Sequence, residues 1–197
     1  SLPGMTKEEG LATAFALSSM FVQATARSGN IGGTFWKTVL ERPYQRKGRE
    51  ALQRLASIKG YEYLDPYYED EHGNLRQKDF ITVFSNILEA MRDMDDQQRK
   101  ELMEAVIPQW HIGSTEAVAT FIEDLQRDLR TQVEQLMKAG IIPEGDPDEV
   151  RIEDAIRAYI DQILNVDPAD IDYMLAGMMS TWNYQVERMA SMWKAAL

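Results

Sequence analysis

The sequence of 197 residues contains no cysteine and only two histidines, His72 and His111. Without cysteine the chain forms no disulfide and binds no metal through thiolates. Neither histidine lies near a recognisable nucleophile motif, which a Ser-His-Asp triad would require. We therefore expect no metal and no cofactor, and these absences argue against an enzyme.

Long apolar runs are also missing. The most apolar stretch, residues 11–22, is too short to cross a bilayer. It follows Lys7, Glu8 and Glu9, whereas a signal peptide starts with net positive charge. We expect a buried core helix here, no membrane span and a cytoplasmic protein, since the lack of cysteine fits a reducing compartment. Residues 1–4 are interpreted as an addition before a native start at Met5.

The periodicity of apolar residues predicts an all-α fold, a single-domain bundle of about seven or eight helices over residues 5–197 with little or no β-sheet. No stretch alternates with a period of two for long enough to require a sheet. Capping residues, glycines and prolines indicate the helix ends. The expected helices run from Thr6 to Gly29, from Thr34 to the residue before Pro43, from about Gln45 to Lys59, through 80–91, from Asp95 to Pro108 and from Ser114 or Thr115 to Gly140, with two more opening at Asp146-Pro147 and Asp167-Pro168.

Charge is unevenly spread along the chain. Residues 1–60 hold nine Lys or Arg against four Asp or Glu, a net of +5, and the rest holds twelve against twenty-eight, a net of −16. Within the domain this separates a basic segment, 34–60, from an acidic portion, 61–197. An anion could bind the basic helix over 42–59, or these residues form a solvated face or internal ion pairs. The anion-binding candidates are Arg42, Arg46, Lys47 and Arg49.

The segment 61–79 is rich in tyrosine and acid, and residues 61–74 are expected to be irregular, with a turn at residues 72–74. Tyrosine buries a large area at low entropic cost, so the segment suits protein contact. The alternative is a long connection whose rings pack on the core. Read as a calcium loop, it has Tyr68 at the first ligand position and Asp79 in place of the bidentate glutamate, which argues against calcium. The partner-binding candidates are Tyr63, Tyr67, Tyr68, Glu69 and Asp70.

Two further motifs have both a structural and a functional interpretation. The glycine-rich run 29–34 leads into a helix whose first N–H groups could hold a phosphate or carboxylate. It has no Walker pattern and no preceding strand, and a helix stop followed by a cap explains it. In the last helix a stripe of methionine and tryptophan has helical spacing, which indicates either core or a face that grips a partner helix. Its partner-binding candidates are Trp182, Met189 and Trp193.

These patterns favour a non-catalytic interaction, assembly or adaptor protein, whose partner is another protein or a second copy of the chain. One alternative is a helical small-molecule-binding protein or enzyme with an internal pocket of carboxylates and tyrosines. The other is recognition of an anion or nucleic acid through 42–59. The net charge of −16 beyond residue 60 weighs against nucleic acid, because it repels a polyanion.

Overall fold

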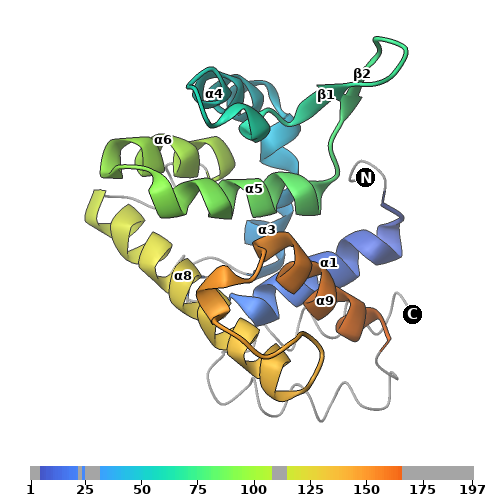
Figure 1. Cartoon of the computed structure of the whole chain (residues 1–197). Coiled ribbons are helices and arrows are strands. Elements are labelled where there is room, and N and C mark those ends of the chain that lie inside the picture. The colour runs from blue at the N-terminus through green and yellow to red at the C-terminus, as the bar shows by residue number, and fades with distance from the viewer. Residues whose placement is uncertain (1–4, 22–23, 25–31, 108–114, 166–197) are drawn as a thin grey trace. The chain divides into compact units, whose positions relative to one another are not determined.

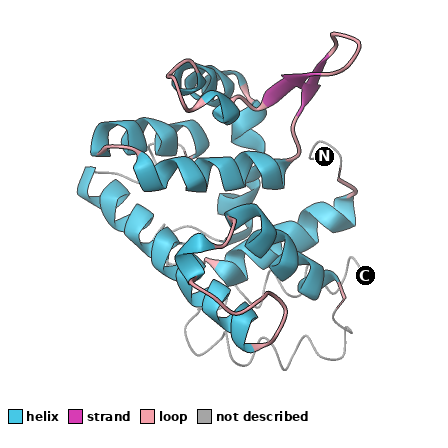
Figure 2. Ribbon diagram, in the orientation of Figure 1, coloured by secondary structure: helices cyan, strands magenta, loops and turns pink. Residues whose placement is uncertain are grey.

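The computed structural model describes residues 5–21, 24, 32–107 and 115–165. It is 71% helical, with seven helices and one small two-stranded sheet in the described residues (Figure 2). The all-α prediction is confirmed. None of the described helices combines the length and the hydropathy that a bilayer crossing demands.

The chain divides into two compact units. The continuous unit is the single stretch Thr38–Ala119, and the discontinuous unit combines Met5–Lys37 with Thr120–Leu197. Both boundaries fall inside helices, α3 (Gly32–Glu41) and α8 (Thr115–Lys138). Single-domain organisation over residues 5–197 stays a prediction.

The discontinuous unit contains α1 (Lys7–Met20), α9 (Ile152–Leu164) and most of α3 and α8. The predicted capping box opens α1: the Thr6 side chain accepts from the Glu9 amide at 3.2 Å, and the Glu9 carboxylate accepts from the Thr6 amide at 2.9 Å. Residues 16–21 are all buried, which confirms the expected core helix. The helix ends at Met20, because Phe21 leaves helical geometry at φ −112° and ψ 54°. Gly29, the predicted end, lies outside the described residues.

The predicted apolar stripe of α8 is buried at every position in the structure. Helix α9 packs against α1. The Asp146-Pro147 pair was expected to open a helix, but it opens only a 3-10 turn, η3 (Pro147–Glu149), and α9 begins later. The Asp148 carboxylate of this turn accepts from the Arg130 guanidinium of α8 at 2.6 Å. The buried stripe consists of Val118, Ile122, Leu125, Leu129, Val133 and Leu136.

The continuous unit is built around the contact of two helices, α4 (Arg46–Ala56) and α6 (Asp96–Val106). They approach so closely at Gly48 that an added Cβ would lie 2.6 Å from the Ala105 carbonyl oxygen. The predicted Asp95 start of α6 is confirmed as a capping box with Gln98. The remaining elements are the end of α3, η1 (Arg42–Tyr44), η2 (Glu62–Leu64), β1 (Tyr67–Glu69), β2 (Leu75–Gln77) and α5 (Phe80–Asp93).

The segment that was expected to be irregular instead forms a β-hairpin. Strands β1 and β2 pair antiparallel with Tyr67 opposite Gln77, Tyr68 opposite Arg76 and Glu69 opposite Leu75. The predicted turn is present, with Gly73 at φ +77°, a conformation that favours glycine. In Figure 1 the hairpin extends away from the helices of its own unit.

Candidate functional site

Exposed apolar side chains are concentrated in one stretch of the sequence, within the continuous unit. Among the described residues five large apolar side chains are exposed, and four of them lie within residues 58–75. Tyr68 is 50% exposed and Leu75 is 70% exposed. Because adjacent positions of the strand pair alternate in direction, Tyr68 and Leu75 lie on opposite faces of the hairpin. Exposed aromatic and apolar side chains are typical of contact sites. We call residues 58–77 the contact segment; its exposed apolar members are Ile58, Tyr63, Tyr68 and Leu75, and the fifth such residue of the chain, Ile141, lies in the discontinuous unit.

The root of the hairpin is held by all three polar groups of Lys78. Its amide donates to the Pro66 carbonyl at 2.9 Å, its carbonyl accepts from the Tyr44 hydroxyl at 2.7 Å, and its ammonium donates to the Tyr63 carbonyl at 3.1 Å. Burial lowers the pKa of Lys78 and raises the pKa of Tyr44, with Asp79 adding to the second effect. The hairpin is therefore anchored to its unit rather than loosely attached.

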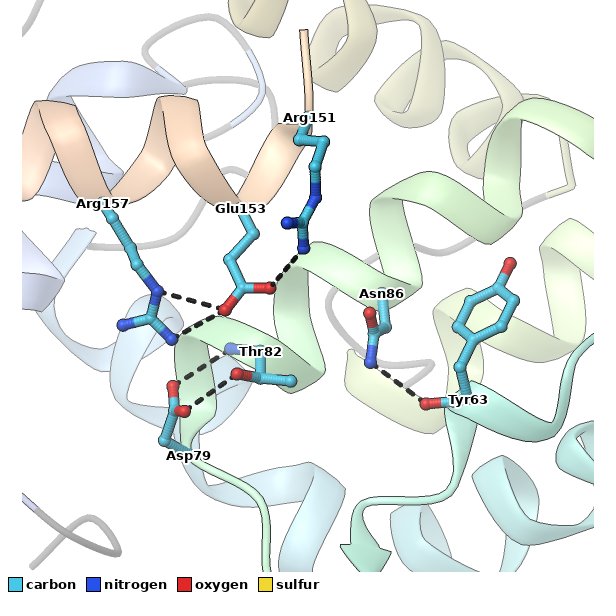
Figure 3. A network of polar contacts seen from close by, with 7 residues as sticks. All are labelled: Tyr63, Asp79, Thr82, Asn86, Arg151, Glu153 and Arg157. Atoms are coloured by element: carbon cyan, nitrogen blue, oxygen red, sulfur yellow. Dashed lines mark hydrogen bonds and ion pairs between the residues drawn. The ribbon is translucent and has the colours of Figure 1, made fainter.

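A second set of contacts fixes the residues on either side of that root. The Asn86 side-chain amide of α5 donates to the Tyr63 carbonyl at 3.0 Å, as Figure 3 shows. The Arg49 guanidinium of α4 lies over the Tyr67 ring, 5.9 Å from its centroid, and Gln77 donates to the Tyr67 hydroxyl at 3.2 Å. One residue predicted to bind an anion and one predicted to bind a partner are thus brought together, and they contact each other.

The hairpin tip is organised by Asp70. Its Oδ1 accepts from the amides of His72 at 2.9 Å and Asn74 at 2.8 Å, and its Oδ2 accepts from Arg76 Nε at 2.9 Å. The hydrogen bond from Arg76, followed by those from the backbone, lowers the pKa of Asp70. Asp70 thus stabilises the tip, while its neighbour Glu69 is exposed.

The other predicted anion-binding residues do not converge on one point in the structure. Arg42 Nε donates to the Glu104 carbonyl at 3.3 Å, and Arg46 forms an exposed ion pair with Glu50 at 3.1 Å. The continuous unit holds eleven Lys or Arg against fifteen Asp or Glu, a net of −4, and the discontinuous unit ten against seventeen, a net of −7. The charge division of the sequence therefore does not follow the division into units. Anion binding through these residues, Lys47 included, stays a prediction.

The discontinuous unit contains buried carboxylates that the sequence analysis did not single out. Asp124 and Asp128 are spaced four residues apart on α8 and are 1% and 6% exposed. The Asp128 carboxylate accepts from the buried amide of Ala24 at 3.1 Å, and Asp124 accepts from Arg127 at 3.1 Å. Their spacing beside Leu125 and Leu129 was the available signal, because it places them next to the buried stripe.

Tyr159 and Glu153 of α9 are the other titratable groups of note in this unit. Burial raises the pKa of Tyr159 to about 12, and a hydrogen bond with Ser19 acts in the opposite direction. Glu153 lies between two arginines, 2.8 Å from Arg157 and 3.4 Å from Arg151 (Figure 3). No three acidic or histidine side chains converge as metal ligands within the described ranges. The candidates Trp182, Met189 and Trp193 lie outside those ranges.

Comparison with protein-family models, with curated proteins and with solved structures found no match.

Proposed function

We propose that this chain is a non-catalytic interaction protein that binds a partner protein through the contact segment. The observation that carries the proposal is the concentration of exposed apolar side chains in residues 58–75 of a segment that is otherwise held by polar contacts. An ordered surface loses little conformational entropy on binding, so more of its contact energy contributes to affinity.

Site-specific photo-crosslinking tests this proposal. The photoreactive amino acid p-benzoylphenylalanine is placed at Tyr68, at Leu75 or, as a matched control, at Ile141. All three are exposed apolar positions, but only the control lies in the discontinuous unit. After irradiation in cells of the native host, we expect the same crosslinked protein from positions 68 and 75 and none from 141.

Competition decides whether the crosslink is specific. Excess unlabelled wild-type chain should remove the crosslinked product, whereas excess of a Tyr68→Ser, Leu75→Ser double variant should leave it. Equal crosslinking from all three positions, or none from positions 68 and 75, would contradict the proposal.

A second candidate function rests on the buried carboxylates Asp124 and Asp128, which suit a helical protein with an internal binding pocket. Their contacts to Ala24 and Arg127 favour a structural role instead. Native mass spectrometry distinguishes an internal binding pocket from a structural role of these carboxylates. Excess mass that disappears on denaturation and is absent from an Asp124→Asn, Asp128→Asn double variant would support the pocket, and an unmodified chain mass would argue against it.

A further inference from the structure

The hydrogen bonds at the two ends of the hairpin determine which main-chain groups point outward. The Asp70 amide donates to the Asn74 carbonyl and the Lys78 amide to the Pro66 carbonyl, both at 2.9 Å. In an antiparallel pair such hydrogen-bonded positions alternate with positions whose N–H and C=O groups face away from the partner strand. The outward-facing positions of β2 are therefore Leu75 and Gln77, and those of β1 are Tyr67 and Glu69.

The two outer edges of this sheet differ. On β1, the outward amide of Tyr67 already donates to Asp65 Oδ1 at 3.0 Å. On β2, the main-chain groups of Leu75 and Gln77 have no hydrogen-bond partner in the part of the chain that the structure describes. All three residues of β2 are exposed. An open edge of this kind is a template for an additional strand.

The side chains of β2 restrict what that strand contains. Leu75 offers the most exposed large apolar side chain of the described residues. Arg76 uses its Nε to hold Asp70, and its two terminal nitrogens have no partner in the described ranges. They remain as donors for a second carboxylate, which a guanidinium can bind through two parallel hydrogen bonds. The next residue, Lys78, is also basic, but its ammonium already donates to the Tyr63 carbonyl, so Arg76 is the donor that the strand offers.

We propose that β2 binds an extended segment of a partner protein as a third strand. That segment carries an acidic residue opposite Arg76, flanked by apolar residues that cover Leu75. The inference rests on the proposed function and specifies its partner: a peptide in which apolar and acidic residues alternate.

A second copy of this chain fits the same edge poorly. Antiparallel pairing that overlaps all three residues of two β2 strands sets Arg76 opposite the same arginine of the other copy. The register shifted toward Gln77 sets Arg76 opposite Lys78. Both arrangements place like charges directly across from each other, which destabilises a strand pair. The opposite shift sets Arg76 opposite Asn74 and extends the pair into the turn, where Gly73 at φ +77° is not extended.

Titration of the full chain with defined peptides, followed by NMR, tests the proposal. The probe is the capped heptapeptide Thr-Val-Glu-Val-Glu-Val-Thr, and its matched control has lysine in place of both glutamates. We expect saturable shifts at the amides of Leu75 and Gln77 with the glutamate peptide and slower hydrogen exchange there. Leu75→Ser should weaken binding about tenfold, because a buried leucine side chain is lost from the interface. Equal binding of the lysine peptide would overturn the proposal.

Two proline variants separate strand addition from contact with a hairpin face. Gln77→Pro removes an outward amide from β2, and Glu69→Pro removes one from β1, while both leave the inward hydrogen bonds intact. We expect Gln77→Pro to abolish binding and Glu69→Pro to retain it, with the amides of Asp70 and Arg76 still protected from exchange in both. Gln77→Ala controls for loss of the glutamine side chain.

Each remaining outcome also decides the question. Equal loss of binding in the two proline variants, each with a folded hairpin, overturns strand addition. So does a dimer in sedimentation velocity that Gln77→Pro dissociates, because the occupant would then be a second copy. If Gln77→Pro unfolds the hairpin, strand addition is tested by the Leu75→Ser variant and the lysine peptide instead. A specific crosslink from Tyr68 without peptide shifts at β2 overturns this inference and leaves the proposed function standing.

Discussion

The two units place polar and apolar groups in opposite ways. Of six buried polar side chains in the described residues, five belong to the discontinuous unit. Of five exposed large apolar side chains in the same residues, four belong to the continuous unit. The discontinuous unit buries polar side chains, and the continuous unit exposes large apolar ones.

The two kinds of side chain differ in what they require of their surroundings. A buried polar group requires a partner inside the protein, as the Asp128 carboxylate has in the Ala24 amide. An exposed apolar group such as Leu75 has no such requirement. Among the described residues, the discontinuous unit thus accommodates more buried polar side chains, and the continuous unit leaves more large apolar side chains exposed.

The largest effect is expected at the centre of the continuous unit. Gly48→Ala places a methyl group against two carbonyl oxygens, those of Arg42 and Ala105, and neither is a side chain that can move aside. We expect the free energy of unfolding to fall by about 3 kcal/mol, measured by urea denaturation. Gly145→Ala is the matched control, because no atom lies within 4 Å of the added methyl, and its effect should stay within about 0.5 kcal/mol. If Gly48→Ala left the free energy of unfolding unchanged, α4 and α6 would not approach closely at this point.

A smaller loss of unfolding free energy is expected when a buried hydrogen-bond acceptor is removed from the discontinuous unit. Asp128→Ala leaves the Ala24 amide without the carboxylate that accepts its hydrogen bond, and we expect a cost of about 2 kcal/mol. Asp128→Asn retains one oxygen and should cost less. Replacing the exposed Glu123 of the same helix by alanine serves as the control. Undiminished exchange protection of the Ala24 amide in Asp128→Ala would contradict this role.

Acid should loosen the hairpin tip. The pKa of Asp70 is lower in the folded chain than in the unfolded one, so its contribution is fully present above the unfolded pKa of about 3.9 and is lost as the pH falls through the folded pKa. The amide signals of His72 and Asn74 should therefore keep their folded shifts at neutral pH and move together in acid. In Asp70→Asn this transition should be absent. If the transition persisted in Asp70→Asn, another titrating group would be its cause.

The smallest effect is expected at Ser85, the buried polar side chain that departs from the pattern of the continuous unit. Its hydroxyl has no hydrogen-bond partner in the described part of the chain. Ser85→Ala should leave the free energy of unfolding unchanged or raise it by up to about 1 kcal/mol, because an unsatisfied polar group is removed. A loss of more than this amount in urea denaturation would reveal a partner for the hydroxyl and weaken the contrast between the units.

Local sequence signals predicted much of the fold. The capping residues Thr6 and Asp95 act within one helical turn, so both starts were predicted from short motifs. The stripe of α8 depends only on helical spacing. The hairpin was missed because strands of three residues are too short to show alternation. The close approach at Gly48 was missed because it depends on Ala105, which is distant in sequence.

The candidate site was predictable in composition but not in geometry. The sequence identified the tyrosine-rich acidic segment, and the structure shows Tyr63 and Tyr68 exposed there. Tyr67 and Asp70 are instead engaged in contacts with Arg49 and Arg76, and only the hairpin register reveals these pairs. Leu75 gave no signal, because a single leucine in a polar stretch has no periodicity. Partner contact by any of these residues stays a prediction.

The discontinuous unit also has a consequence for biosynthesis. Its first part, which includes α1, is translated before Thr38–Ala119, and its second part follows only afterwards. At about 5–20 residues per second, a ribosome needs about 5–15 s to make the intervening stretch. During that time α1 lacks α9, against which it packs in the finished protein. The nascent chain therefore carries α1 without the helix it packs against while the continuous unit emerges, and the discontinuous unit completes its fold only after α9 has been made.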